Sequence, residues 1–554
     1  MTGMRFLLAL LLVAPVRLLG QGLTSPADDA NNKKTYGLSG TVVNSVTGEP
    51  VARALVQVYA GGEESALTGP DGHFEFAGLP AAQTAVNAQK PGFFSEDQIK
   101  LKNGWLPPAT IMIGPDTSTV TVRLVPEGVI FGRVTANGEP IEGVPVKVME
   151  AQIQDGRKEW TQPGAATTDD EGEFRIPSLM SGEYYLEIGP KYLPGGTAAF
   201  KGHESGYERM FYPGAPGLDA ATPLVVTAGQ RSEVEASLKL EPWYRVSGML
   251  RAGGEGASNT NVEMIDGDGE TVEGMKLNPQ TGEFEVHVPA GSYALHAQQF
   301  GPGGLVGNAS VPVTVNTDVV GMQVVLGPAM TIPVRVRKDE SGKTPTVAPG
   351  QTYLNGNQGR TQVPPISMWM RFAAKTGGGV ANGGMLPNIG VDESGKPESL
   401  AVRNLMPGTY WMEMARNPPW YVDSAQCGNV DLLRDTLTVG ATTPCATIDV
   451  VLRDDGGTLK ANATWEGDPA MGWVVVIPEK APGEATTLQM PRGEDIELSD
   501  MAPGDYSLVL VDRVQGLEFK NPDAMSAYLG KAARVTLSAG QKSSVTLEMV
   551  RVGK

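Results

Sequence analysis

The sequence predicts an all-β protein, a tandem array of about five β-sandwich domains, on three observations. A pattern of hairpin turn, alternating strand and second turn returns along the chain at intervals of roughly a hundred residues. The 70 glycines and 42 prolines lie between alternating hydrophobic runs and not in low-complexity blocks, which is typical of turn-rich β structure. The length of 554 residues is too great for one sandwich and suits about five units of the ~100-residue immunoglobulin type.

The N-terminal stretch predicts a secretory signal peptide over residues 1–21. Arg5 is followed by an apolar run from Phe6 to Val16, which is too short to span a bilayer. An uncleaved anchor is the alternative. Residues 22–35 are polar and predict a flexible leader, and no later segment is long and apolar enough to cross a membrane.

The recurring pattern is clearest at residues 168–186. Gly172 lies in a polar turn and can adopt the positive φ of a tight hairpin. Phe174 and Ile176 alternate with charged residues, as in a strand with one buried face. Gly182 and Tyr184 then predict a tyrosine corner of the kind found in immunoglobulin-like sandwiches, with the ring buried and the hydroxyl bonded to nearby backbone.

Related copies occur at residues 280–293, 392–410 and 492–506. An earlier copy, residues 70–84, keeps the hairpin but has Ala82 and Thr84 where the glycine and tyrosine stand, so we expect a weaker corner there. A repeat of this length is much longer than a solenoid period, so each copy should have its own core.

These copies predict β-sandwich domains at residues 36–126, 127–241, 242–327, 328–453 and 454–554. The second has a long stretch at 194–223 that we expect to be irregular, and the fourth has a long loop insertion. Residues 522–529 are the one short stretch that we expect to be helical. The connections are only a few residues long, so the sandwiches should abut one another.

Charge and cysteine content limit the partners. The formal charge of -18 argues against nucleic acid and anionic membrane surfaces as main partners. The two cysteines, Cys427 and Cys445, lie in one unit, and such a pair in an exported protein predicts a disulfide. A metal site or a nucleophile is the alternative, but each would need further ligands or a base that the sequence does not reveal.

The repeated motifs Gly-x-Val, Gly-x-Pro-[Ile/Val], Val-x-Val, Thr-x-x-x-Gly-x-Phe and Gly-x-Tyr resemble the carboxypeptidase regulatory-like domain, a transthyretin-like or prealbumin-like β-sandwich. The resemblance is close in residues 36–94 and 128–240 and fainter further on, where the chain is similar to large multi-domain bacterial exported members of this group. It implies a domain that is usually non-catalytic. Related sandwiches are grouped with carbohydrate-binding-like folds, which is an analogy of fold and not a site.

The residues also argue against an enzyme and predict no cofactor. A zinc carboxypeptidase needs two histidines and a glutamate on the metal, and the catalytic motif is absent. There is no nucleophile elbow, P-loop or dinucleotide-binding glycine motif. The four histidines, which we expect to be solvent-facing or satisfied within the fold, are His73, His203, His287 and His296.

Two sets of residues remain as weak binding candidates. Asp266, Asp268 and Glu270 alternate oxygen ligands as a calcium loop does, but the loop lacks a terminal bidentate glutamate, and turn chemistry alone explains them. Exposed aromatic rings could hold a sugar, although rings beside apolar strands are more often core. The aromatic candidates are Trp369, Trp420 and Tyr421 in the fourth unit and Tyr207 and Tyr212 in the second.

The sequence therefore predicts an exported, non-enzymatic scaffold or adhesion and interaction protein of the cell envelope. We expect it in the periplasm, on the cell surface or secreted, with protein or glycan partners. The alternative is a carbohydrate-binding protein that uses loops of the second and fourth sandwiches.

Overall fold

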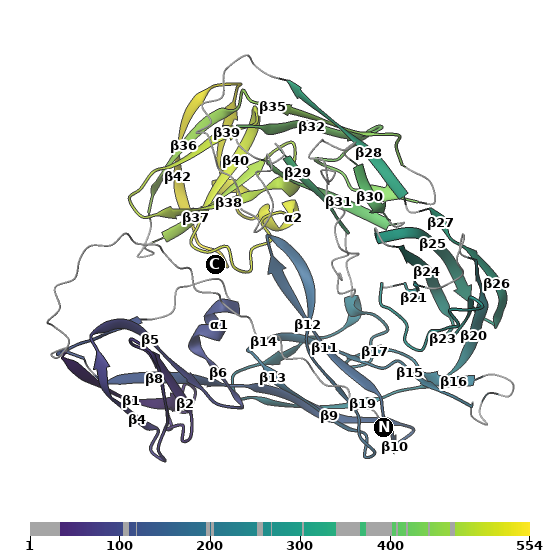
Figure 1. Ribbon diagram of the computed structural model, residues 1–554, viewed down its shortest axis with the longest axis horizontal. Helices are drawn as coiled ribbons and strands as arrows, with labels where there is room; N and C mark the ends of the chain where they lie inside the picture. The colour runs from purple at the N-terminus through teal and green to yellow at the C-terminus, as the bar shows by residue number, and fades with distance from the viewer. Residues whose placement is uncertain are drawn as a thin grey trace, which may run out of the picture. The chain divides into compact units, whose positions relative to one another are not determined.

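The computed structural model describes residues 34–102, 110–117, 119–195, 200, 204–251, 259–267, 269–301, 304–328, 330–339, 366–372, 401–405, 408–416, 419–440, 444–465 and 471–553. These residues are almost entirely β-strand, as predicted (Figure 1). The predicted signal peptide, most of the leader and most of the insertion in the fourth sandwich lie outside the described residues. No helix within the described ranges is long and apolar enough to cross a membrane.

The chain divides into two compact units. The first unit runs to Lys90 and includes Pro107–Leu124, and the second contains Pro91–Leu106 and Val125–Lys554. The first unit holds most of the first predicted sandwich, and the second unit holds Pro91–Leu106 and the rest of the chain.

One strand arrangement occurs five times within the described residues. In each repeat the first strand pairs antiparallel with the strand that follows the hairpin turn and parallel with the last strand of the repeat. The five sets are β1 (Thr35–Asn44) with β4 (His73–Pro80) and β8 (Val120–Pro126); β9 (Gly128–Ala136) with β13 (Glu173–Leu179) and β19 (Arg231–Ser237); β20 (Leu240–Arg251) with β23 (Glu283–Pro289) and β26 (Val319–Val325); β28 (Met330–Asp339) with β30 (Ala401–Leu405) and β35 (Ile448–Arg453); and β36 (Gly457–Thr464) with β39 (Ile496–Met501) and β42 (Lys542–Val550).

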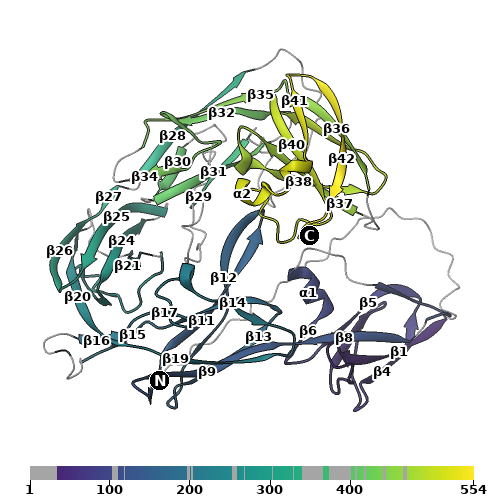
Figure 2. The ribbon, with the colours of Figure 1, turned by 180° about the vertical axis from the view of Figure 1, so that it is seen from behind.

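A second set of strands supplies the facing layer of each repeat. In the first two repeats these are β2 (Leu55–Tyr59), β3 (Glu63–Leu67), β5 (Ala82–Gln89) and β7 (Thr110–Ile113), and then β11 (Pro145–Gln154), β12 (Arg157–Thr167), β14 (Gly182–Ile188), β17 (Met210–Phe211) and β18 (Leu224–Val226). In the third and fourth they are β21 (Thr260–Asp266), β24 (Gly291–Gly301), β25 (Gly304–Val315) and β27 (Gly327–Pro328), and then β29 (Ile366–Phe372), β31 (Gly408–Arg416) and β34 (Leu437–Val439). In the fifth they are β37 (Met471–Pro478), β38 (Thr486–Pro491), β40 (Gly504–Val511) and β41 (Ala533–Leu537), and here β42 pairs with both β36 and β40, so that the two layers join in one sheet (Figure 2).

The remaining elements are short. They are β6 (Phe93–Ser95), α1 (Glu96–Lys102), β10 (Glu139–Pro140), β15 (Lys191–Leu193), β16 (Glu204–Tyr207), η1 (Leu218–Ala220), β22 (Lys276–Leu277), β32 (Tyr421–Cys427), β33 (Val430–Asp431), η2 (Pro482–Glu484), α2 (Pro522–Met525) and η3 (Leu529–Lys531).

Each repeat from the second to the fifth encloses its own hydrophobic cluster. Val146 and Phe174 are buried in the second, Val246 and Val286 in the third, and Val450 in the fourth. Along most of the strands buried residues alternate with more exposed ones, so one face of the sheet packs inward and the other is turned away from the core. The fifth repeat has a second cluster on the other face of β37 and β40, beneath α2.

The predicted tyrosine corners are present in the second, third and fifth repeats. The hydroxyls of Tyr184, Tyr293 and Tyr506 donate to the backbone carbonyl four residues earlier, at 2.6, 3.0 and 2.6 Å. In the first repeat Thr84 stands at this position, and its hydroxyl bonds to the backbone of Tyr59 at 3.2 Å. The first repeat therefore lacks the tyrosine ring that anchors the other three.

The glycine within the first strand of a repeat, which belongs to the Gly-x-Val motif in the first two repeats, is explained by the strand pairing. A Cβ on Gly40, Gly132 or Gly248 would lie 2.2, 1.8 or 2.2 Å from a carbonyl oxygen of the last strand of the repeat. Only glycine permits this close approach of the two parallel strands.

The structure corrects the expectation of an irregular stretch at residues 194–223. β16, β17 and η1 lie within it, and β16 pairs with β20 of the third repeat. The sheet of the third repeat therefore includes strands from the predicted second domain, and the boundary at residue 241 remains a prediction.

The helices also differ from the prediction. The helix expected at residues 522–529 is confined to α2, where the Asn521 side chain accepts from the backbone N–H of Asp523 and caps it. α1 was not expected. Its start is a capping box, because Ser95 Oγ accepts from Gln98 N at 3.1 Å and Gln98 Oε1 accepts from Ser95 N at 2.8 Å.

Candidate functional site

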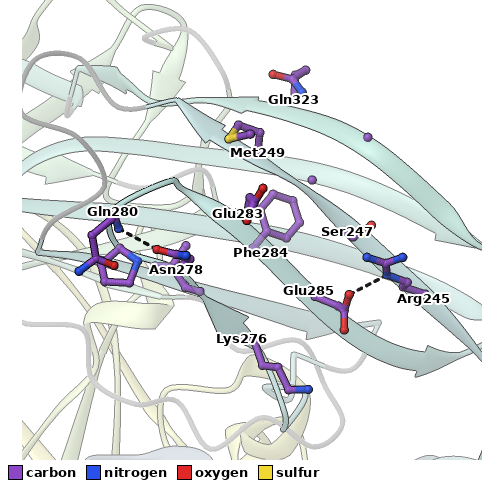
Figure 3. A pocket seen from close by; sticks show the side chains of 14 residues that line it. Arg245, Ser247, Met249, Lys276, Asn278, Gln280, Glu283, Phe284, Glu285 and Gln323 are labelled. Carbon is purple, nitrogen blue, oxygen red and sulfur yellow. Dashed lines mark hydrogen bonds and ion pairs between the residues drawn. The ribbon is translucent and has the colours of Figure 1, made fainter. Parts of the chain in front are cut away.

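The outer face of the third sandwich carries an open groove. Its volume is about 800 Å³ (Figure 3). The groove is lined by Arg245, Ser247, Gly248 and Met249 of β20; Lys276, Leu277, Asn278, Pro279 and Gln280 of β22 and the following turn; Glu283, Phe284 and Glu285 of β23; and Gly321 and Gln323 of β26.

Strand alternation places these side chains. Val246 of β20 and Val286 of β23 are buried in the core, so their neighbours Arg245, Ser247 and Glu285 face outward. Gly248 and Gly321 carry no side chain, so no side-chain atoms fill the groove at these two positions.

The groove is polar, and two of its charged side chains pair with each other within the sheet. Arg245 Nε lies 2.7 Å from Glu285 Oε2, and the backbone N–H of Arg245 donates to Asp318 Oδ1 at 3.0 Å (Figure 3). Asn278 Oδ1 accepts from the backbone N–H groups of Gln280 and Thr281. The lining holds no histidine or cysteine, and its one hydroxyl, Ser247, faces the Arg245 and Glu285 pair. The groove can therefore present hydrogen-bonding groups to a partner, but it assembles no nucleophile and base.

An aromatic cluster lies on the same face beside the groove. The rings of Tyr192 and His287 stack with centroids 4.8 Å apart, and Tyr192 also contacts Trp243 at 5.5 Å. His287 Nε2 lies 3.0 Å from Glu204 Oε2. Since His287 is the strand partner of Arg245, the cluster and the groove are contiguous.

Sequence reasoning missed this cluster because it assigned Tyr192 and Glu204 to the second sandwich and an irregular stretch. Only the pairing of β16 with β20 brings them onto the third sandwich. Trp243 is 3% exposed, so this cluster joins strands and offers no open ring face.

A second, smaller groove of about 590 Å³ lies at one end of the third sandwich. It is lined by Asn259, Thr260, Asn261, Phe300 and Gly301. Phe300 is 45% exposed, which makes it an aromatic ring beside amide side chains.

The predicted aromatic candidates lie mostly in cores. Tyr421 is 2% exposed and its hydroxyl donates to Asp455 Oδ1 at 2.7 Å, so its ring is not available to a ligand. Trp420 packs against the core of the fourth sandwich, and Tyr207 and Tyr212 pack against that of the second. Trp369 lies on β29, but its side chain is outside the described residues.

The predicted calcium ligands have protein partners. Arg209 Nη1 lies 2.8 Å from Asp266 Oδ2, and Lys147 Nζ lies 3.8 Å from Glu270 Oε2. Asp266 Oδ1 also accepts from the backbone N–H of Glu270, as in a hairpin turn. Asp268 lies outside the described residues. Within the described ranges, no three His, Cys, Asp or Glu side chains gather as a metal site requires.

The pKa of Glu270 is raised mainly by burial and by the nearby Glu187 carboxylate, while Lys147 and Arg209 oppose this shift. The cations thus keep a buried carboxylate cluster in place, which is a structural use of these acids.

The other histidines show no catalytic arrangement. His73 is exposed at the start of β4, and burial lowers the pKa of His296 on β24. His203 lies outside the described residues.

Cys427 and Cys445 are joined by a disulfide in the fourth sandwich. Cys427 is 1% exposed and belongs to the hydrophobic core there.

Comparison with known proteins identifies one domain. Residues 37–125 match the carboxypeptidase regulatory-like domain, in agreement with the sequence prediction for the first sandwich. No curated protein matches the chain by sequence.

Solved structures with similar β folds include the Bacillus anthracis TIE protein, at 13% identity and a TM-score of 0.16, with coverage of 53% of this chain and 51% of that one. They also include the shaft pilin SpaA from Lactobacillus rhamnosus GG, at 12% identity, a TM-score of 0.21 and coverage of 37% and 98%. The minor pilin of Streptococcus agalactiae has 14% identity, a TM-score of 0.20 and coverage of 37% and 95%. Likenesses of this size do not extend to function.

Proposed function

We propose that the protein is an exported, non-enzymatic scaffold or adhesion protein of the cell envelope, built from carboxypeptidase regulatory-like and related sandwiches. The observation that carries the proposal is the use of ionisable and polar side chains at the joints between sandwiches. In the part of the chain that the structure describes, these groups are distributed among several joints.

The joint between the second and third sandwiches has the most such contacts. Arg209, between β16 and β17, pairs with Asp266 at the end of β21, and these side chains are only 14% and 21% exposed. Lys147 of β11 bridges Glu187 of β14, at 3.2 Å, and Glu270. Ion pairs that are mostly shielded from water are screened less by salt than surface pairs, so they hold the joint in one geometry.

The joints between the third and fourth and between the fourth and fifth sandwiches also use polar side chains. Asn308 Nδ2 of the third sandwich donates to the carbonyl of Leu405 in the fourth at 3.1 Å. Asp455, between the fourth and fifth, accepts from Tyr421 and Arg453, and its carbonyl accepts from Gly540 N at 2.7 Å. A chain with joints fixed in this way is suited to hold other molecules at a set distance or to present them.

Distance measurements between sandwiches test the proposal. Spin labels at Val225 and Val320, which are 59% and 65% exposed on the second and third sandwiches, should give one narrow distance distribution. Fractionation of cells that express the full chain should find it outside the cytoplasm. A broad distribution, or zinc-dependent release of C-terminal residues from peptides by the purified protein, would contradict the proposal.

Glycan binding is the second candidate function, and Phe300 favours it. An exposed ring beside Asn259 and Asn261 is the arrangement that stacks on a sugar and bonds its hydroxyls. A glycan array with the full chain should then give hits that Phe300→Ala removes and that Val320→Ala, another exposed site on the same sandwich, keeps. An array without hits would exclude this candidate.

A further inference from the structure

The tip of the β11–β12 hairpin is shaped to project from the second sandwich. Asp155 and Gly156 form its two-residue turn with φ of 47° and 73°, between the last strand pair Gln154 and Arg157. An Asp-Gly turn with both φ values positive follows the right-handed twist of a hairpin, so the tip continues the strands without distortion.

This tip contacts a segment more than 300 residues later in the sequence, in the fifth sandwich. The backbone N–H of Lys520 donates to the carbonyl of Gly156 at 3.1 Å, and Lys520 Nζ pairs with Asp155 Oδ2. Arg157 Nη2 donates to the carbonyl of Gly483 at 3.1 Å. Both segments belong to the second compact unit, and both views place the start of β12 near α2, which follows Lys520 (Figures 1 and 2).

Two aromatic rings complete the contact, Trp411 on β31 of the fourth sandwich and Phe519 of the fifth. The guanidinium carbon of Arg157 lies 5.2 Å from the ring centroid of Trp411, in the range of a cation–π contact. Phe519 is 7% exposed, and its ring lies so close to Gly156 that a Cβ there would be 2.6 Å from the nearest ring atom. Residue 156 must therefore be glycine for two reasons. Its φ is positive, and the Phe519 ring leaves no room for a Cβ.

We infer that the hairpin tip (residues 154–157) and its receiving segment (residues 519–520, with Gly483 and Trp411) form a releasable clasp. The clasp holds the fifth sandwich to the second and opens without unfolding either. Each of these sandwiches has its own core, and no strand pairing links the tip to the fifth sandwich. The contact includes one ion pair, two hydrogen bonds and two ring contacts. None of these groups belongs to the cluster between the layers of the second or of the fifth sandwich, so its loss leaves both of these clusters intact.

Salt should favour opening. The Asp155 side chain is 57% exposed, so the ion pair is screened when the Debye length falls to about 3 Å near 1 M salt. The ring contacts remain at high salt, so the clasp becomes weaker but still forms.

Zero-length carbodiimide cross-linking of the full chain tests the clasp, because it joins a carboxylate to an amine only when the two are in contact. Wild-type protein in low salt should give an Asp155–Lys520 cross-linked peptide by mass spectrometry. Lys460 and Asp495, 2.9 Å apart within the fifth sandwich, supply the internal standard. If the Lys460–Asp495 product forms and the Asp155–Lys520 product does not, the clasp is absent.

Two variants distinguish loss of the contact with Phe519 from strain in the turn itself. Gly138 occupies the same place in the Asn137–Gly138 turn of the second sandwich, with a φ of 85° and no atom within 4 Å of an added Cβ. Gly156→Ala should reduce the Asp155–Lys520 product by roughly tenfold, since overpacking against a ring favours the open state. Gly138→Ala should leave the product unchanged.

The remaining outcomes also decide the inference. An equal yield in Gly156→Ala and wild type would overturn the role of the ring contact. A yield that does not fall between 0.1 M and 1 M salt, relative to the internal standard, would show that the contact is permanent and not releasable. Unchanged circular dichroism in Gly156→Ala would confirm that opening leaves the sandwiches folded.

Discussion

At the scale of single residues, several buried or half-buried polar side chains stabilise the joints between sandwiches. Tyr421 illustrates this, because it resembles a ligand platform in the sequence and is a buried hydrogen-bond donor in the structure. Burial, and then the bond to Asp455, raise the pKa of this tyrosine, so it stays protonated and donates at any physiological pH. Its partner Asp455 is correspondingly held as a carboxylate.

Asp455 should make the joint between the fourth and fifth sandwiches sensitive to acid. The hydrogen bond from Arg453, helped by Tyr421, lowers the pKa of Asp455 from 3.8 to about 2. A lowered folded-state pKa contributes stability that is complete above pH 3.8 and is lost as the pH falls through about 2. The loss should be on the order of 1–2 kcal/mol, because Arg453 is about a third exposed and partly screened.

Hydrogen exchange of peptides from β32 and β36 between pH 5 and pH 2 measures this loss. Asp455→Asn should be less stable than wild type at pH 5, and the difference should shrink toward pH 2. Asp449→Asn is the control, since Asp449 is 55% exposed and its partner Arg335 is 73% exposed. A constant difference across the pH range would mean that Asp455 is not the titrating group.

At the scale of elements, the parallel pair of first and last strands requires glycine where the strands come closest. Gly40→Ala should destabilise the first sandwich by about 1–3 kcal/mol, because the new Cβ would strike the carbonyl of Val120 and the ring of Phe74. Gly37→Ala on the same strand is the control, since its Cβ would lie 3.6 Å from the nearest atom. Thermal unfolding followed by hydrogen exchange of the β1 peptide compares the two variants, and equal effects would contradict the close-approach explanation.

The disulfide should stabilise the fourth sandwich through the unfolded chain. It closes a loop over a sequence separation of 18 residues, which corresponds to about 3 kcal/mol of lost chain entropy. Reduction should therefore lower the unfolding temperature of the fourth sandwich more than that of the fifth, which is coupled to the fourth only through their joint. The double variant Cys427→Ala with Cys445→Ala should show the same loss plus a packing cost, because Cys427 is buried. No change on reduction would assign the cysteines a role other than stability.

Much of the architecture could be predicted because its signals are local. Gly172, Phe174 and Tyr184 lie within a short window and specify turn, strand and corner together, so the repeat was visible before the structure. The capping box of Ser95 and Gln98 was equally local and was overlooked. The pairing of β16 with β20, the cluster of Tyr192 with His287, and the docking of Gly156 on Phe519 depend on residues far apart in sequence, and no short pattern encodes them.

At the scale of the whole molecule, the joints make neighbouring sandwiches of the second unit depend on one another. The joint between the second and third sandwiches should lose this coupling in Arg209→Gln. The variant removes a partly buried ion pair with Asp266 and should cost about 1–3 kcal/mol. Unfolding by urea, followed by pulsed hydrogen exchange, should show the second and third sandwiches unfolding at closer midpoints in wild type than in Arg209→Gln.

Arg175→Gln is the control for this experiment, since Arg175 is 54% exposed and pairs with Glu127 within the second sandwich. If Arg209→Gln and Arg175→Gln behave alike, the joint contributes no coupling.

The parallel pairing of first and last strands also decides how each sandwich responds to tension. Two strands that run side by side in the same direction place the entry and the exit of the chain at opposite ends of the sandwich. A pull on the two termini therefore slides β1 along β8, or β9 along β19, and loads every rung of the ladder at once, where an antiparallel pair would unzip one rung at a time. Each such module therefore resists stretching by shear.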